Sequence, residues 1–214
     1  MRLYIIRHGE TVWNTEGRLQ GRKDIDLNEN GVRLGKITGE GLKDIPFDLV
    51  FTSPLKRAKE TAILALAGRK VPIIEDKRLI EISFGSWEGL CCRKDNCQIP
   101  EDKFPKFFED ALKYVPPEDG ETLQNVIART GDFYKELINT PEYQDMNILI
   151  AAHGCSTRAL LCNVLDEYKD FWRGMVPPNC AVSIVDVTDG KSSLLELDKV
   201  YYDKKDIVDY YKPE

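Results

Sequence analysis

The sequence predicts an α/β fold, a three-layer αβα sandwich in which a mostly parallel mixed sheet has helices on both faces. Short apolar runs of β-prone residues alternate along the chain with stretches of helical spacing, and this alternation is typical of such a sheet. Polar, reactive residues directly follow two of the apolar runs. With 214 residues the chain can form one sizeable core but hardly two, so we expect a single domain over residues 1–214.

Six segments have the short, apolar composition of strands. They cover residues 3–6, 48–52, 71–74, 147–152, 181–187 and 194–199. We expect the last of them at an edge of the sheet.

Helices are expected between these strands. Asn28 or Asn30 can cap a helix that continues through Leu42. Ser53 is expected to open a second helix, because Pro54 after it suits the first helical position. Two further helices are expected over residues 122–138 and directly after His153.

The segment 90–117 has mixed charges, prolines and aromatic residues, and we interpret it as a partly helical insertion or lid over the sheet edge. Its Phe104, Phe107 and Phe108 suit either an apolar wall for a substrate or packing in the core. The usual burial of such aromatic side chains favours the core. The C-terminal tail 201–214 alternates aromatic and charged residues. It would pack on the domain, cover a partner in a homodimer, or fray.

Composition excludes several classes of protein. The formal net charge is -6 and the pI about 5.2, which argues against nucleic acid or an anionic membrane as a partner. An apolar span and a signal peptide are both missing from the sequence, which predicts a cytoplasmic protein. The six cysteines are expected to be free thiols. Cys91, Cys92 and Cys97 are close in sequence but lack the partners of a zinc site, so we expect no metal and no cofactor.

Reactive side chains follow the first expected strand. Arg7 offers a guanidinium for phosphate, and His8 an imidazole that can attack phosphorus. Gly9 allows backbone N–H groups to approach an oxyanion. The only other histidine, His153, also follows a strand and also precedes a glycine. Because ligands of open α/β sheets bind at the carboxyl ends of strands, we expect both histidines at one site.

A series of motifs continues from these residues through most of the chain. They are Arg7-His8-Gly9-Glu10-Thr11, Trp13-Asn14, Gly17-Arg18-Leu19-Gln20-Gly21, Asp26-Leu27, Ser53-Pro54-Leu55-Lys56-Arg57-Ala58, Thr61-Ala62, Leu79-Ile80-Glu81, Phe84-Gly85, Trp87-Glu88-Gly89, Gly120-Glu121-Thr122, His153-Gly154, Arg158 and Asn179-Cys180. In content and order they resemble the histidine phosphatase (phosphoglycerate mutase-like) superfamily. The segment 90–117 and the tail carry no such motif.

The resemblance implies phosphoryl transfer without a metal. His8 would be the nucleophile and form a phosphohistidine, which divides one difficult transfer into two easier ones. Arg7, Arg57 and His153 would surround the phosphoryl oxygens and stabilise the charge of the transition state. The implied substrate is a small phosphorylated metabolite.

The resemblance also implies an acid and base. Glu81 would protonate the leaving group and then deprotonate water, although an ion pair with Arg78 or Arg57 is an alternative role for this carboxylate. Phosphate or substrate contacts are implied for Gly9, Glu10, Thr11, Asn14, Gln20, Gly21 and Gly154. Glu121 and Arg158 match more loosely and would support the site from behind it.

Two motifs resemble the phosphatase branch of the superfamily more than the mutase branch. They are the runs 17–21 and 84–89. We therefore expect a phosphatase that hydrolyses small phosphate monoesters, with phosphoglycerate mutase-type transfer as the first alternative. An inactive relative that binds a phosphorylated ligand or a protein is the second alternative.

Overall fold

Six strands form one mixed sheet of order β3-β2-β4-β1-β5-β6 in this computed structural model, which describes residues 1–93, 96–100 and 104–208. The strands are β1 (Arg2–Arg7), β2 (Leu49–Thr52), β3 (Ile73–Glu75), β4 (Asn147–Ala152), β5 (Val182–Thr188) and β6 (Lys191–Lys199). The first four are mutually parallel, and β5 and β6 are antiparallel to their neighbours. All six expected strands are confirmed, and the last does lie at an edge.

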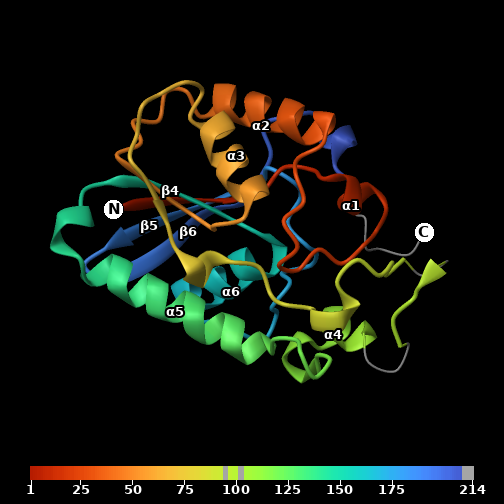
Figure 1. The fold of residues 1–214 in the computed structure, drawn as a ribbon. Coiled ribbons are helices and arrows are strands. Elements are labelled where there is room, and N and C mark those ends of the chain that lie inside the picture. Colours follow the sequence, from red (N-terminus) through yellow and green to blue (C-terminus); the bar gives the residue numbers. More distant parts are fainter. Residues whose placement is uncertain (94–95, 101–103, 209–214) are drawn as a thin grey trace.

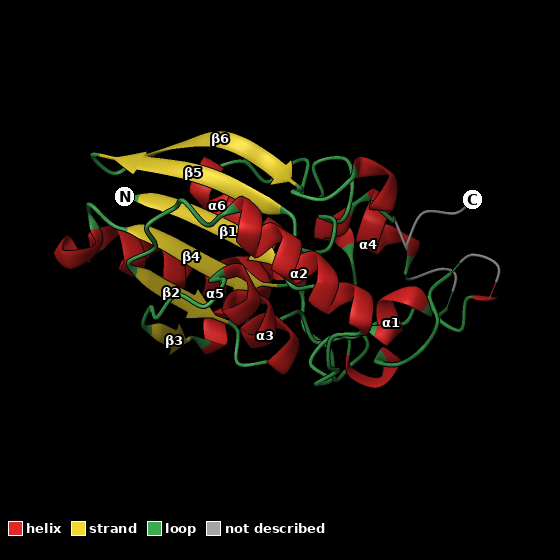
Figure 2. Cartoon of the chain, turned by 90° about the horizontal axis from the view of Figure 1, so that it is seen from above, coloured by secondary structure: helices red, strands yellow, loops and turns green. Residues whose placement is uncertain are grey.

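Helices cover both faces of the sheet (Figure 1). They are α1 (Val12–Thr15), α2 (Glu29–Gly41), α3 (Lys56–Ala65), α4 (Pro105–Glu109), α5 (Leu123–Asn139) and α6 (Gly154–Leu165). Helices α2 and α3 lie on one face, and α5 and α6 lie on the other. The carboxyl ends of the parallel strands point toward the side where α1 and α4 lie (Figure 2). The predicted three-layer αβα architecture is thereby confirmed.

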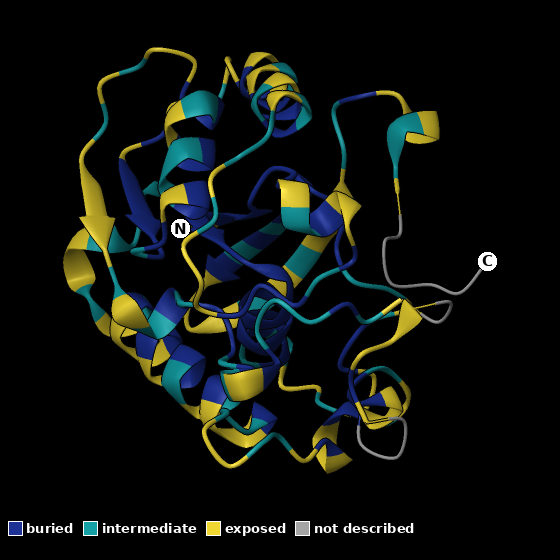
Figure 3. Ribbon diagram, turned by 45° about the vertical axis from the view of Figure 1, so that its right-hand side comes forward, coloured by how far each residue is buried: buried dark blue, intermediate teal, exposed yellow. Residues whose placement is uncertain are grey.

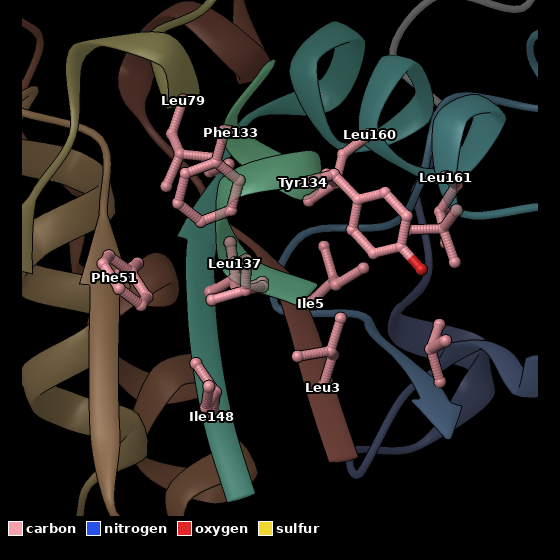
Figure 4. Close-up of a cluster of buried hydrophobic side chains, with 14 of the residues drawn as sticks. Leu3, Ile5, Phe51, Leu79, Phe133, Tyr134, Leu137, Ile148, Leu160 and Leu161 are labelled. Carbon is pink, nitrogen blue, oxygen red and sulfur yellow. The ribbon is translucent and has the colours of Figure 1, made fainter. Parts of the chain in front are cut away.

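Successive side chains along each strand point to opposite faces of the sheet, so part of the core lies on each face. In β1, Leu3 and Ile5 pack with α5 and α6, whereas Tyr4 and Ile6 pack on the side of α3. This period of two is a property of any extended strand. Figure 4 shows Leu3 and Ile5 below the side chains of α5 and α6. The central strands are buried, while the helices expose their outer surfaces (Figure 3).

Side-chain caps explain where two helices begin. The Asn28 side chain accepts a hydrogen bond of 2.8 Å from the Gly31 N–H and caps α2. Thr122 caps α5 in the same way, through a 3.2 Å bond from the Asn125 N–H. Both caps satisfy N–H groups that have no partner within the helix.

The predicted start of α3 at Ser53 and Pro54 is wrong. The helix begins at Lys56, because Leu55 before it has an extended backbone with φ of -74° and ψ of 137°. The Ser53 hydroxyl accepts from the Leu55 N–H at 3.3 Å and also contacts His153 Nε2 at 2.7 Å. Ser53 therefore serves the end of β2 and a neighbouring histidine instead of capping a helix.

The segment 90–117 packs against the loops beside the sheet. Phe104 and Phe107 are buried in a cluster with Phe84 and Trp172, and Phe108 packs partly buried against it. These contacts confirm the core interpretation of the phenylalanines. Parts of the segment, 94–95 and 101–103, lie outside the described residues.

The beginning of the tail packs within the chain. The buried Tyr202 hydroxyl donates a hydrogen bond of 2.7 Å to the Asn179 carbonyl oxygen. Tyr210 and Tyr211, which we considered for a dimer contact, lie outside the described residues. All six cysteines are free. Among the described residues, none of the helices has the length and apolar character that crossing a membrane requires.

Candidate active site

The register of the parallel strands brings three residues together at the carboxyl edge of the sheet. Arg7 at the end of β1 lies opposite Ala152 in β4, and Thr52 in β2 lies opposite Ala151. The residue that follows each of these three strands therefore lies beside the other two. These residues are His8, His153 and Ser53. The ring centroids of the two histidines are 5.2 Å apart.

His8 is held in the form that a nucleophile needs. Its ring Nδ1 lies 2.7 Å from the Gly9 carbonyl oxygen, and because a carbonyl only accepts, Nδ1 must carry the proton. Nε2 then has a lone pair. Burial lowers the pKa of His8 well below its ordinary value of 6.5, and the charges of Arg57 and Arg7 lower it further. His8 is therefore a neutral imidazole whose Nε2 carries no proton.

The backbone of His8 is fixed by segments from distant parts of the chain. Its N–H donates to the Ala152 carbonyl at 3.0 Å, and its carbonyl accepts from Asn179 Nδ2 at 3.0 Å. The Gly9 N–H donates to Thr61 Oγ1 at 2.9 Å. Although the motifs include Asn179 and Thr61, their roles do not follow from spacing, because each contact depends on the folded chain.

Two buried arginines provide positive charge beside His8. Arg7 donates through Nη1 to the Pro177 carbonyl, and its buried Nε has no hydrogen-bond partner among the described residues. Arg57 in the first turn of α3 donates to the carbonyls of Lys23 at 2.7 Å and Gly21 at 2.8 Å. These carbonyl contacts orient both guanidinium groups, which suit the oxygens of a phosphoryl group.

Glu81 lies at the N-terminus of α6. Its carboxylate accepts from the N–H groups of Ile82 at 2.9 Å, Cys155 at 3.1 Å and Ser156 at 3.1 Å. The anion thus lies where the positive end of the helix dipole is strongest. The alternative role as an ion-pair partner of Arg78 is wrong, because that guanidinium pairs with two other carboxylates, those of Asp76 at 2.5 Å and Glu136 at 2.7 Å.

His153 is paired on one ring nitrogen only. Nε2 contacts Ser53 Oγ at 2.7 Å, while the buried Nδ1 has no hydrogen-bond partner in the described part of the chain. Burial is the main cause that lowers the pKa of His153 well below 6.5, and the Arg57 charge adds to it. The Ser53 hydroxyl accepts from the Leu55 N–H and can also donate its own proton to His153 Nε2, which is one of the two tautomers that this contact allows. In that tautomer Nδ1–H is a donor that lacks an acceptor.

A cavity of about 40 Å³ lies among these groups. The predicted site residues that line it are Arg7, His8, Gln20, Gly21, Arg57, Glu81 and Gly154. Four aromatic residues also line it, namely Phe84, Phe107, Phe108 and Trp172. The alternative that the phenylalanines of segment 90–117 form an apolar wall therefore holds for Phe107 and Phe108, which also pack in the core, and Phe104 is not part of the lining. A Cβ on Gly154 would approach Val176 Cγ1 to 3.2 Å, so a side chain at this position would have to displace that methyl group by a few tenths of an ångström.

The remaining predicted residues lie behind this lining. His153 is beside His8, and Gly9 is turned toward α2, where a Cβ would come within 2.8 Å of the Gly31 carbonyl oxygen. Thr11 and Asn14 bond to each other in the capping box of α1. Glu10 accepts from Asn28 Nδ2 at 2.7 Å.

Glu121 and Arg158 occupy different surroundings. Glu121 pairs with Arg129 at 3.0 Å and with Arg22 at 3.1 Å. The fully buried Arg158 pairs with Asp198 in β6 at 2.5 Å. Arg158 therefore ties α6 to the sheet edge.

The described residues contain no group of three or more histidine, cysteine, aspartate or glutamate side chains that could hold a metal ion. The charge available to an anionic ligand in the cavity comes from the side chains of Arg7 and Arg57 and from the dipole of α6.

The model of the histidine phosphatase superfamily, branch 1, matches residues 3–199. The chain belongs to this superfamily. Within it, the chain is 29% identical over 198 residues to phosphoserine phosphatase 1 of Hydrogenobacter thermophilus, with 92% of each sequence covered. It is 36% identical over 168 residues to a 2,3-bisphosphoglycerate-dependent phosphoglycerate mutase of Cytophaga hutchinsonii, with 76% of each covered.

Solved histidine phosphatase structures show the same fold. Bacillus stearothermophilus YhfR aligns with a TM-score of 0.84 and 31% identity, over 93% of this chain and 97% of the other. A putative α-ribazole-5'-P phosphatase from Escherichia coli aligns with a TM-score of 0.81 and 28% identity, over 93% and 96%. Relatives of this member of the superfamily thus have names from both the phosphatase and the mutase branch.

Proposed function

We propose that the protein is a metal-independent phosphatase that hydrolyses small phosphate monoesters through a phosphohistidine at His8. The observation that supports it best is the hydrogen bond from His8 Nδ1 to the Gly9 carbonyl. This bond leaves a neutral Nε2 next to a cavity lined by Arg7 and Arg57. Nucleophile and charge-stabilising groups are the two requirements of phosphoryl transfer.

The first step transfers the phosphoryl group to the enzyme. The Nε2 lone pair of His8 attacks phosphorus, and the bond between phosphorus and the ester oxygen breaks. The ester binds as its monoanion and passes its proton to the Glu81 carboxylate, which transfers it to the leaving oxygen so that the alcohol departs. Arg7 Nε, Arg57 and the Nδ1–H of His153 stabilise the phosphoryl oxygens.

The second step releases inorganic phosphate. Glu81, now a carboxylate, takes a proton from water while the water oxygen attacks phosphorus and the bond to His8 Nε2 breaks. The carboxyl group passes this proton to the departing phosphate and is a carboxylate again, and the net reaction is ester plus water to alcohol plus phosphate. The Nδ1–H of His8 stays bonded to Gly9 throughout, so the imidazole begins and ends neutral.

Mutase-type transfer uses the same first step. It differs in that a second acceptor takes the phosphoryl group before water does. The runs 17–21 and 84–89 support the phosphatase branch, and relatives named as phosphoserine phosphatase and α-ribazole phosphatase support it further.

A labelling experiment tests the proposal. The protein is mixed with a ³²P-labelled monoester, and released phosphate and acid-labile protein-bound label are both counted. We expect phosphate release and label on His8, no turnover in His8→Ala, and slow turnover with intact folding in His153→Ala. Isomerisation of phosphoglycerate without phosphate release would support the mutase instead, and unchanged turnover in His8→Ala would refute the mechanism.

A further inference from the structure

Four aromatic rings form a continuous wall on one side of the active-site cavity. Phe84 contacts Phe107 with ring centroids 5.2 Å apart, and Phe107 contacts Phe108 at 5.1 Å. Phe107 and Phe108 contact Trp172 at 5.0 and 5.7 Å. All four rings line the cavity. Since each ring rests on another, the wall is already ordered before a substrate binds.

A hydrogen bond fixes the wall across two segments of the chain. The Trp172 indole Nε1–H donates to the Phe107 carbonyl oxygen at 2.6 Å. This contact joins α4 to the loop after α6. Behind the wall lies a second cavity of about 260 Å³, which Phe108 and Trp172 also border. The two cavities therefore share Phe108 and Trp172 in their linings.

Every charged side chain in the active-site lining already has a role in the proposed phosphoryl transfer. Within the described part of the chain, the charged side chains that line the cavity are those of Arg7, Arg57 and Glu81. The proposed mechanism uses each of them. A carboxylate group elsewhere on the substrate would lie against aromatic rings, where an unpaired anion is costly.

The size of the cavity places the organic part of a substrate on the wall. A volume of about 40 Å³ holds roughly three water molecules, which is the room that a phosphoryl group needs. We place the carbon skeleton of an ester beside the phosphoryl group, against Phe108 and Trp172, because these two side chains line this cavity and also border the second one.

We infer that the preferred substrates are phosphate monoesters of a flat, uncharged, aromatic alcohol, and that Phe108 determines this preference. The inference rests on the proposed phosphatase function and specifies its substrate class. An aromatic ring on the substrate gains ring contacts with Phe108 and Trp172 and gives up no charge solvation. Esters that carry an amino acid or carboxylate group are disfavoured.

The first test compares esters whose leaving groups have similar reactivity. Values of kcat/KM are measured for benzyl phosphate, ethyl phosphate and phosphoserine, all of which are esters of alkyl alcohols. We expect at least a tenfold preference for benzyl phosphate over each of the others. Equal or better hydrolysis of phosphoserine would overturn the inference and leave the phosphatase function intact. No phosphate release from any ester, together with no label on His8, would overturn both.

Variants at Phe108 give the second test. Phe108→Ala should lower the ratio of benzyl to ethyl phosphate hydrolysis at least fivefold. Phe108→Arg supplies a cation and should raise kcat/KM for phosphoserine at least tenfold, a gain that misfolding cannot produce. Leu112→Ala is the matched control, because Leu112 borders the second cavity but does not line the active site, and it should leave the ratio unchanged. An unchanged ratio in Phe108→Ala, or no gain in Phe108→Arg, would overturn the inference.

Discussion

Replacing Glu81 by glutamine separates the two proposed proton transfers. In the native site Oε1 accepts from Ile82 and Ser156, and Oε2 accepts from Cys155. The amide oxygen of glutamine can keep the first two bonds, but its NH₂ group then faces the Cys155 N–H and loses the third. One lost bond to a buried donor costs about 1–2 kcal/mol of folding free energy, so Glu81→Gln should still fold.

The kinetic effect should depend on the leaving group. Losing a general acid and base lowers turnover by roughly 10²–10⁴-fold. With p-nitrophenyl phosphate the leaving group departs without a proton, so Glu81→Gln should still form the phosphohistidine but hydrolyse it slowly. Stopped-flow absorbance should then show a burst of about one nitrophenol per active site before slow turnover. With ethyl phosphate the first step also needs the acid, and no burst of alcohol should form.

A neighbouring carboxylate provides the control. Glu88 accepts from the N–H groups of Arg22 at 2.9 Å and Phe84 at 3.2 Å and does not line the cavity, so Glu88→Gln should lose less than about tenfold in turnover. Turnover of Glu81→Gln within about threefold of the native protein would refute the acid and base role. A loss of the same size for both esters with no burst would refute the two-step assignment.

Three further predictions concern pH, an internal ion pair and metals. The folded pKa of both histidines is lowered below 6.5, so the unfolded chain binds up to two more protons in acid. The free energy of unfolding should be fully retained above pH 6.5 and fall by up to about 2.7 kcal/mol per pH unit below it; equal urea midpoints at about pH 7.5 and 5.5 would contradict this. Asp198→Asn leaves the buried Arg158 without its carboxylate and should lower the free energy of unfolding by about 3 kcal/mol. Asp186→Asn, in the exposed pair with Arg2, should lower it by only about 0.5 kcal/mol. Thermal denaturation measures both losses, and losses of similar size would refute the argument from burial. EDTA should leave phosphate release unchanged, and a loss restored by Mg²⁺ or Zn²⁺ would exclude the metal-independent mechanism.

Local pattern was enough to predict the strands and the edge where His8 and His153 meet. An apolar run such as 147–152 forms a buried strand of a sheet, and a histidine directly after it must lie at the carboxyl edge of that sheet. The cap at Asn28 was predicted for the same reason, since it depends on residues three positions apart.

Contacts between distant segments could not be predicted in this way. Serine is a residue type that often caps helices, yet the Ser53 hydroxyl contacts a histidine 100 residues further along the chain. The bond from Trp172 to Phe107 joins segments with no shared periodicity. Aromatic burial correctly predicted that the phenylalanines pack in the core, but the cavity that Phe107 and Phe108 also line exists only between folded segments.

The position of β1 in the sheet has a consequence for how the protein is made. Of the six strands, the one that ends just before the proposed nucleophile His8 is synthesised first, yet its neighbours β4 and β5 are the fourth and fifth to be synthesised. During synthesis the backbone groups of β1 therefore stay unpaired until residues 147–188 have been made. Pairing between strands so far apart in the sequence is slow to form. Asn179, which holds the His8 carbonyl, also lies in this late region. The chain therefore carries the proposed nucleophile from its earliest strand onward but can orient it only after β4, β5 and Asn179 have been synthesised.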